Sequence, residues 1–185
     1  MRTVIYSMSV SLDGFIAGPG GDIGFTAPDQ ELMEFHVRQT REIGTELMGR
    51  GLYEVMLVWE DAETTMSGAV ELEFARIWNP IPKVVFSTTL EKVEGNARLA
   101  GDDVAAEVAR LRDAPGEGVV SVGGAGLAAT LIKLDLIDEY RLFVNPVVLG
   151  GGTPYFPSLD AAITLELLET RTFGSRVVYL RYRRG

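Results

Sequence analysis

The chain has 185 residues, of which 46% are hydrophobic and 23% are charged, and its formal net charge is −9. This length and composition predict one globular domain, residues 1–185, and the acidic balance argues against binding to nucleic acid, which requires basic surface. Cysteine is absent, which excludes disulfides and thiol catalysis, and because His36 is the only histidine we expect no metal site.

No apolar run is long enough to span a membrane, and Met1–Tyr6 lacks the features of a signal peptide. We therefore expect a cytoplasmic protein with no membrane partner. Arg181, Arg183 and Arg184 cluster near the C-terminus. We interpret them as residues of a solvated edge strand rather than as a nucleic-acid-binding tail.

The first predicted strand, Arg2–Val10, runs into a glycine-rich loop, Ser11–Asp22. Long loops at strand ends are often functional in α/β domains. Asp13 is the candidate residue of this loop. It either stabilises a turn before Gly14 through its own side chain or serves a bound ligand, and the residues alone favour the turn.

A helix is predicted over Pro28–Ile43, because proline and Asp29 are typical of a helix start. Glu31 and Glu34 lie in its first turns. Both are candidate proton donors, although solvated helix charges explain them more simply. His36 on the same helix is expected to have a packing or surface role.

A short predicted strand, Thr45–Met48, is followed by Gly49-Arg50-Gly51 and a further helix. A cation at a helix start opposes the helix dipole unless an anion offsets it. Arg50 is therefore expected either to form a salt bridge or to bind a phosphate. After a connection over Val58–Thr65, Ser67 is predicted to cap another helix.

Lys83–Phe86 is predicted to be a buried strand, and it ends in Ser87-Thr88-Thr89. Hydroxyl groups at the carboxyl edge of an α/β sheet lie where such sheets bind their ligands, although they are also common in turns. A weak strand at Ala97–Leu99 follows, and then a helix capped by Asp102 or Asp103.

The stretch Val119–Leu127 combines a continuous apolar strand, a run of glycines and the start of an amphipathic helix. Gly123, Gly124 and Gly126 lie at this junction. Without a Cβ atom they allow a phosphate to approach the unpaired N–H groups at the helix start. The alternative is that these glycines only permit a tight turn.

The last predicted strands follow one another without helices between them. Asp138–Val144 is followed by the glycine-rich segment Pro146–Pro154, and Glu166–Phe173 and Arg176–Arg183 predict a hairpin. Earlier strands alternate with helices. The pattern therefore predicts an α/β fold whose mixed sheet is mostly parallel at its centre and antiparallel at its C-terminal edge.

Three junctions occur in one order along the chain: Met48–Glu54, Val84–Thr89 and Val122–Gly126. This ordered set resembles the dihydrofolate reductase-like superfamily, whose three-layer fold has helices on both sides of a mixed sheet. Ser11–Gly14 and Pro146–Gly152 resemble more closely the reductase domain of the bifunctional riboflavin-biosynthesis deaminase-reductase. The deaminase half is absent, so the chain is expected to perform only a reduction.

The resemblance implies that NADPH binds at the carboxyl edge of the sheet and that a homodimer reduces a small heterocyclic or carbonyl substrate. The activity it suggests first is reduction of 5-amino-6-(5-phosphoribosylamino)uracil. It places Asp13 at the substrate as the catalytic residue, with Glu31 as a second substrate contact. The implied cofactor contacts are Gly49, Arg50, Ser87, Thr88, Gly123, Gly124, Ala125 and Gly126.

Two alternatives stay open. Dihydrofolate reductase itself carries an acid on its first helix, for which Glu31 is a loose positional match, but the loop before that helix lacks the usual tryptophan. The arginine that follows the glycines there is Gly126 or Leu127 here, which leaves the choice between NADPH and NADH open. A nucleotide-binding module without turnover would share the same pocket.

Overall fold

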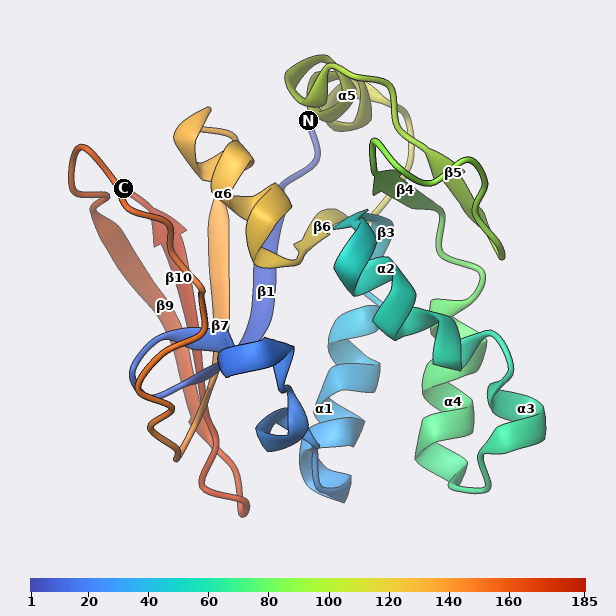
Figure 1. Ribbon diagram of the computed structural model, residues 1–185, viewed down its shortest axis with the longest axis vertical. Coiled ribbons are helices and arrows are strands. Elements are labelled where there is room, and N and C mark those ends of the chain that lie inside the picture. Colours follow the sequence, from blue (N-terminus) through green and yellow to red (C-terminus); the bar gives the residue numbers. More distant parts are fainter.

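The computed structural model describes the whole chain, residues 1–185 (Figure 1). Helices lie between groups of strands up to β7, and strands alone follow. Short 3₁₀ turns lie at Pro19–Gly21, Gly24–Thr26 and Leu57–Trp59. The elements in order are β1 (Val4–Ser11), β2 (Phe15–Ala17), α1 (Gln30–Thr40), β3 (Ile43–Gly49), α2 (Arg50–Met56), α3 (Ala62–Thr65), α4 (Ala69–Trp78), β4 (Lys83–Phe86), β5 (Ala97–Leu99), α5 (Val104–Asp113), β6 (Val119–Gly123), α6 (Ala125–Lys133), β7 (Glu139–Asn145), β8 (Thr153–Pro154), β9 (Leu165–Thr172) and β10 (Val178–Arg184).

The main sheet has eight strands in the order β5-β4-β3-β6-β1-β7-β10-β9. β10 is antiparallel to both of its neighbours, and every other pairing in this sheet is parallel. β2 and β8 form a separate antiparallel pair. The predicted mixed sheet with a C-terminal hairpin is therefore confirmed. Because parallel strands end at one edge, the segments after β3, β4 and β6 lie side by side.

Helices cover both faces of the sheet (Figure 1). On one face, Tyr6, Leu47 and Val120 pack with residues of α5 and α6 in the largest apolar cluster. On the other, Met48 and Val85 pack with residues of α1, α2 and α4. Two covered faces are the usual requirement of a parallel sheet, and they explain why its strands read as continuous apolar runs.

Some predicted boundaries are wrong. α4 begins after Gly68, which provides no side-chain cap, so Ser67 does not cap this helix. The connection over Val58–Thr65 contains the short helix α3. The helix predicted over Pro28–Ile43 is shorter than expected, because its last residues lead into β3.

The C-terminal arginines also differ from expectation, because β10 lies inside the sheet and β9 forms its edge. Arg181 contacts both carboxylate oxygens of Glu139 at 2.9 Å, and Arg183 pairs with Glu166 at 2.5 Å. Ion pairs along neighbouring strands therefore account for these arginines.

The sequence left Asp102 and Asp103 as alternative caps of α5, and the structure identifies Asp103. The Asp103 carboxylate accepts a hydrogen bond from the Ala106 N–H at 2.9 Å, at the start of α5. We expect Asp103→Ala to lower the free energy of unfolding by about 1 kcal/mol, because it removes this cap. Denaturant titration measures the change. Asp102→Ala is the matched control, and equal losses in the two variants would contradict the assignment.

Candidate active site

A cavity of about 700 Å³ lies between the sheet and the helices α1 and α2. Its floor consists of side chains on one face of four adjacent strands. Its walls come from β2, the loop before α1, the helices α1, α2 and α4, and the start of α6. The floor residues are Ile5, Ser7 and Ser9 of β1, Glu46 of β3, Ser121 and Gly123 of β6, and Arg141 and Phe143 of β7.

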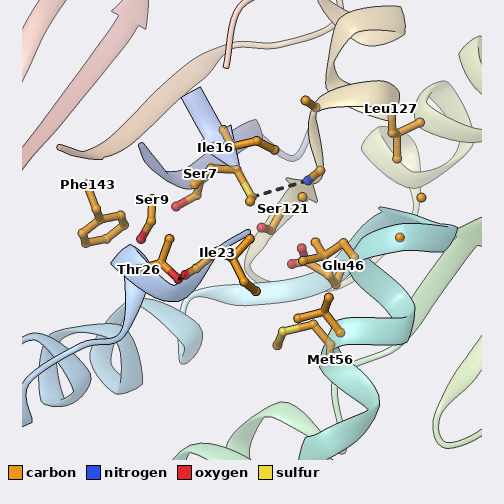
Figure 2. A pocket seen from close by; sticks show the side chains of 18 of the residues that line it. Ser7, Ser9, Ile16, Ile23, Thr26, Glu46, Met56, Ser121, Leu127 and Phe143 are labelled. Carbon is orange, nitrogen blue, oxygen red and sulfur yellow. Dashed lines mark hydrogen bonds between the residues drawn. The ribbon is translucent and has the colours of Figure 1, made fainter. Parts of the chain in front are cut away.

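Strand register brings these floor residues together. Ser121 of β6 lies beside Ile5 of β1 and beside Glu46 of β3. Ser7 of β1 lies beside Arg141 of β7. Side chains two residues apart share a face of a strand, so the polar residues gather on the face of α1. Figure 2 shows the side chains of Ser7, Ser9, Ser121 and Glu46 around this space.

A second cavity, of about 540 Å³, lies beyond the carboxyl ends of β3 and β4. The hydroxyl residues Ser87, Thr88 and Thr89 line it. Gly49, Arg50 and Leu127 line both cavities. The two cavities therefore adjoin along the edge of the sheet where α/β folds of this kind bind ligands.

The three glycines of the junction Gly123–Gly126 differ in backbone conformation and in the space around them. Gly124 has φ +90°, a backbone conformation that favours glycine, and its N–H points to the Met8 sulfur at 3.4 Å (Figure 2). A Cβ atom at Gly123 would collide with Leu52, whereas one at Gly126 would have no atom within 4 Å. α6 has no side-chain cap, so its first N–H groups remain available for an anion.

Arg50 lies where the two cavities adjoin. Its Nε donates to the Glu54 carboxylate at 2.6 Å, and its Nη1 donates to the Thr89 hydroxyl at 2.9 Å. The side chain is half exposed, and Nη2 has no protein partner. The salt bridge that was one of two expectations is present, and binding of a phosphate stays a prediction.

The hydroxyl segment after β4 is organised by Ser87. Its Oγ accepts hydrogen bonds from the N–H groups of Thr89 at 3.1 Å and Leu90 at 3.0 Å, which closes a turn. Thr88 is exposed on the smaller cavity. Both residues therefore line the smaller cavity, where Ser87 has a structural role, and their contact with a cofactor stays a prediction.

Asp13 joins two distant loops and does not line either cavity. Its carboxylate accepts hydrogen bonds from the Ser11 hydroxyl at 2.7 Å, the Leu149 N–H at 3.0 Å and the Gly150 N–H at 2.7 Å. The bond from Ser11, followed by that from Leu149, lowers the pKa of Asp13 to about 2. The contact with substrate implied by the family resemblance stays a prediction.

The same two loops also contact each other through residues other than Asp13. Gly152 has φ +132°, and a Cβ atom there would collide with the backbone of Ala17. The Tyr155 N–H donates to the Gly14 carbonyl at 2.9 Å. This packing fixes β2, whose residues Ile16 and Ala17 line the larger cavity.

Glu31 is also placed outside the cavities, on an exposed part of α1. Its carboxylate accepts from Arg171 at 3.1 Å and from the Gly174 N–H at 2.9 Å, which ties α1 to the β9–β10 hairpin. The Gly174 bond is the main reason why the pKa of Glu31 is lowered. The residues of α1 that line the larger cavity are His36, Gln39 and Thr40.

Sequence reasoning missed the charged residue at the cavity floor, Glu46. Its side chain is buried, and its Oε2 has no hydrogen-bond partner. Burial raises the pKa of Glu46 to about 7. The available signal was a glutamate inside an otherwise apolar strand, between Thr45 and Leu47.

Arg141 and His36 were likewise missed as cavity residues. Arg141 is buried, and its guanidinium contacts Glu139 at 2.6 Å and Glu42 at 3.0 Å. Burial lowers the pKa of His36 to about 4, and its ring lies 4.5 Å from that of Phe143. The imidazole is therefore neutral near pH 7. No group of three or more His, Cys, Asp or Glu side chains is arranged to hold a metal ion.

None of the helices is both long enough and apolar enough to cross a membrane.

Comparisons with known proteins identify the family. The uncharacterised protein YyaP of Bacillus subtilis (strain 168) is 35% identical over 98% of this chain and 94% of its own length. Among solved structures, a Shewanella sp. PV-4 protein described as a riboflavin biosynthesis protein has a TM-score of 0.79 and 22% identity, and the match covers 100% of this chain and 99% of that chain. Dihydrofolate reductase from Enterococcus faecalis complexed with NADP(H) has a TM-score of 0.64 and 16% identity, and the match covers 99% of this chain and 96% of that chain. These likenesses show the dihydrofolate reductase-like fold. A family model described as the RibD C-terminal domain matches residues 2–179, and the chain belongs to this family.

Proposed function

We propose that the protein is an NADPH-dependent reductase of a small heterocyclic or carbonyl substrate, with 5-amino-6-(5-phosphoribosylamino)uracil as the first candidate. The observation that carries this proposal is the pair of adjoining cavities that share Gly49, Arg50 and Leu127. A dinucleotide has two ends joined by a charged pyrophosphate. Two pockets with glycines and an arginine between them suit such a molecule.

The residues present fit the cofactor. Gly126 leaves open space beside the first N–H groups of α6, and Arg50 has an unpaired Nη2 nearby on the shared boundary. These groups would hold the pyrophosphate, and Ser87 and Thr88 would contact the adenosine end. When bound, reduced nicotinamide supplies a hydride to a carbon atom of the substrate.

The larger cavity would hold the substrate together with the nicotinamide end of the cofactor. Its volume of about 700 Å³ is that of a small-molecule site, and serine hydroxyls of its floor can bind polar groups. Ser7 and Ser9 belong to β1, which pairs on both sides within the sheet. Groups on paired strands are held more rigidly than groups on loops, which favours a defined orientation of the substrate.

The structure favours this proposal over dihydrofolate reduction. A pterin needs an acid on the first helix, but no carboxylate of α1 lines the cavity, and Glu31 is tied to Gly174 instead. Calorimetric titration with NADPH and NADH, followed by assays of cofactor oxidation with the aminouracil and with dihydrofolate, tests the proposal. Oxidation with the aminouracil would support it. Binding without oxidation would indicate a nucleotide-binding module, and turnover of dihydrofolate without turnover of the aminouracil would overturn the aminouracil as the first candidate. We also expect a homodimer, which analytical ultracentrifugation can test.

Gly126→Val tests the pyrophosphate position. A Cβ atom at Gly126 has no neighbour within 4 Å, so the fold should tolerate the new side chain while it obstructs the approach of an anion. We expect NADPH affinity to fall by about tenfold or more, equivalent to about 1.4 kcal/mol. Gly151→Val is the matched control, because Gly151 also faces open space and lines neither cavity. Equal affinity in the two variants would exclude this binding position.

Arg50→Ala tests the cofactor phosphate contact. A charge-assisted hydrogen bond contributes roughly 1.5–3 kcal/mol, so we expect NADPH affinity to fall by about ten- to a hundredfold. A loss confined to NADPH would indicate the 2′-phosphate, and equal losses for NADPH and NADH would indicate the pyrophosphate. Arg41→Ala is the control, because Arg41 forms an exposed ion pair with Glu73 and neither residue lines a cavity. No loss for either cofactor would limit Arg50 to its pair with Glu54.

Asp13→Asn separates a structural role from a role in turnover. Leu149 and Gly150 donate to separate oxygens of Asp13, and the amide nitrogen of asparagine cannot accept one of these two bonds, so we expect a lower Tm with unchanged NADPH affinity. If Asp13 also serves the substrate, kcat/KM falls further than in Ser11→Ala, which weakens the same loop contact. Turnover equal to that of Ser11→Ala, measured where both variants are folded, would limit Asp13 to the loops.

A further inference from the structure

Among the residues that line the larger cavity, Glu46 provides the only carboxyl group. The other ionisable side chains of this lining are His36, Arg50 and Arg141. Figure 2 shows the Glu46 carboxyl group directed from β3 toward Ser121 and the interior of the cavity. Glu46 is 4% exposed, and its Oε2 has no partner in the protein. A buried polar atom without a partner needs an explanation, and a catalytic role is one of them.

No side chain on the strands beside Glu46 forms a salt bridge with its carboxyl group. Lys83 of β4 lies in register with Glu46, but its Nζ donates to the carbonyls of Trp78 at 2.9 Å and Ile81 at 3.1 Å. This ammonium group therefore binds backbone at the end of α4, and it forms no salt bridge with Glu46. On the opposite side, Ser121 of β6 contributes only a hydroxyl group.

The other ionisable groups of the cavity cannot act as proton donors near neutral pH. Arg141 is paired with Glu139 and Glu42, Arg50 is paired with Glu54, and a guanidinium does not lose its proton in proteins. His36 is neutral because burial lowers its pKa. Residues from α2 other than Arg50, and those from α4, add no charge to the lining.

We propose that the carboxyl group of Glu46 donates the proton in the reduction catalysed by this site. The proposal rests on the proposed function. Reduction of a C=O or C=N bond adds a hydride to carbon and a proton to oxygen or nitrogen. Two electrons and one hydrogen come from the reduced nicotinamide, which becomes oxidised. The proton comes from Glu46, which becomes a carboxylate and regains a proton from solvent.

The protonation equilibrium suits this role. Burial raises the pKa of Glu46 to about 7, although the neighbouring Ser121 hydroxyl and the charge of Lys83 act in the opposite direction. A general acid is most effective when its pKa lies near the working pH. The carboxyl group therefore has a proton to donate at neutral pH, whereas an exposed glutamate would have lost it.

A titration without any ligand tests the first requirement. With ¹³C-labelled glutamate carboxyl groups, NMR of the wild type is expected to show one resonance that titrates near pH 7 and is absent from Glu46→Gln. Glu91→Gln, an exposed substitution with the same change in charge, should keep that resonance. A Glu46 resonance that titrates at the ordinary glutamate value would overturn the proposal.

Stability gives a second readout that does not depend on turnover. A raised pKa means that the folded state favours the protonated form, so this contribution is complete below the unfolded pKa of about 4.5 and is lost as the pH rises through about 7. The Tm of Glu46→Gln relative to wild type should therefore increase over this pH window. A difference that does not change with pH would contradict the titration.

Turnover of the aminouracil distinguishes a failure of the proposed reductase function from a failure of the role of Glu46 as proton donor. Glu46→Gln should reduce kcat/KM by about 10²- to 10⁴-fold, the usual contribution of a general acid, with NADPH affinity unchanged. In the wild type, kcat/KM should fall as the pH rises through about 7, which remains testable if the variant does not fold. Wild-type protein that binds no NADPH or shows no turnover would overturn the proposed function. An active wild type whose Glu46→Gln variant keeps full activity and the same pH profile would overturn only the role of Glu46.

Discussion

Both faces of the central strands are covered by helices, but buried charged side chains lie on only one of them. On one face, Tyr6 and Val120 pack with residues of α5 and α6. The other face carries Ser7, Glu46 and Arg141 on three of the central strands. Arg141 has carboxylate partners there, whereas the buried Oε2 of Glu46 has none, which costs free energy. The helices α1 and α2 cover this face without filling the space above it, and the resulting cavity is the feature on which the proposed chemistry depends.

The wall of the cavity opposite α2 depends on loops that are fixed by hydrogen bonds. Asp13 accepts hydrogen bonds from the backbone N–H groups of Leu149 and Gly150. Gly152 approaches the backbone of Ala17 so closely that position 152 has no room for a side chain. The glycine-rich segment after β7 is thus explained by packing between loops. Residues that orient a ligand need such support, because small displacements of a reacting group greatly reduce its effect.

The sequence was most informative where one residue type has a local consequence. Continuous apolar runs identified the buried strands, and the glycines of Val119–Leu127 identified the strand-to-helix junction. The backbone partners of Asp13 and Glu31 were not predictable, because Leu149, Gly150 and Gly174 lie more than 130 residues away in the chain. Glu46 was missed for a related reason. A polar residue in a strand can face solvent or a cavity, and only the pairing of β3 with β4 and β6 decides between them.

The distribution of charge separates the two ends of the site. Arg50 and the start of α6 provide positive potential at the boundary between the cavities, although the chain as a whole is acidic. Deeper in the larger cavity, the charge of Arg141 is offset by Glu139 and Glu42, so it does not stabilise an ionised Glu46 as an unpaired cation would. Exclusion from water is then the main influence on the pKa of Glu46. The same burial that makes its ionised form unfavourable for folding retains the proton that a reduction requires.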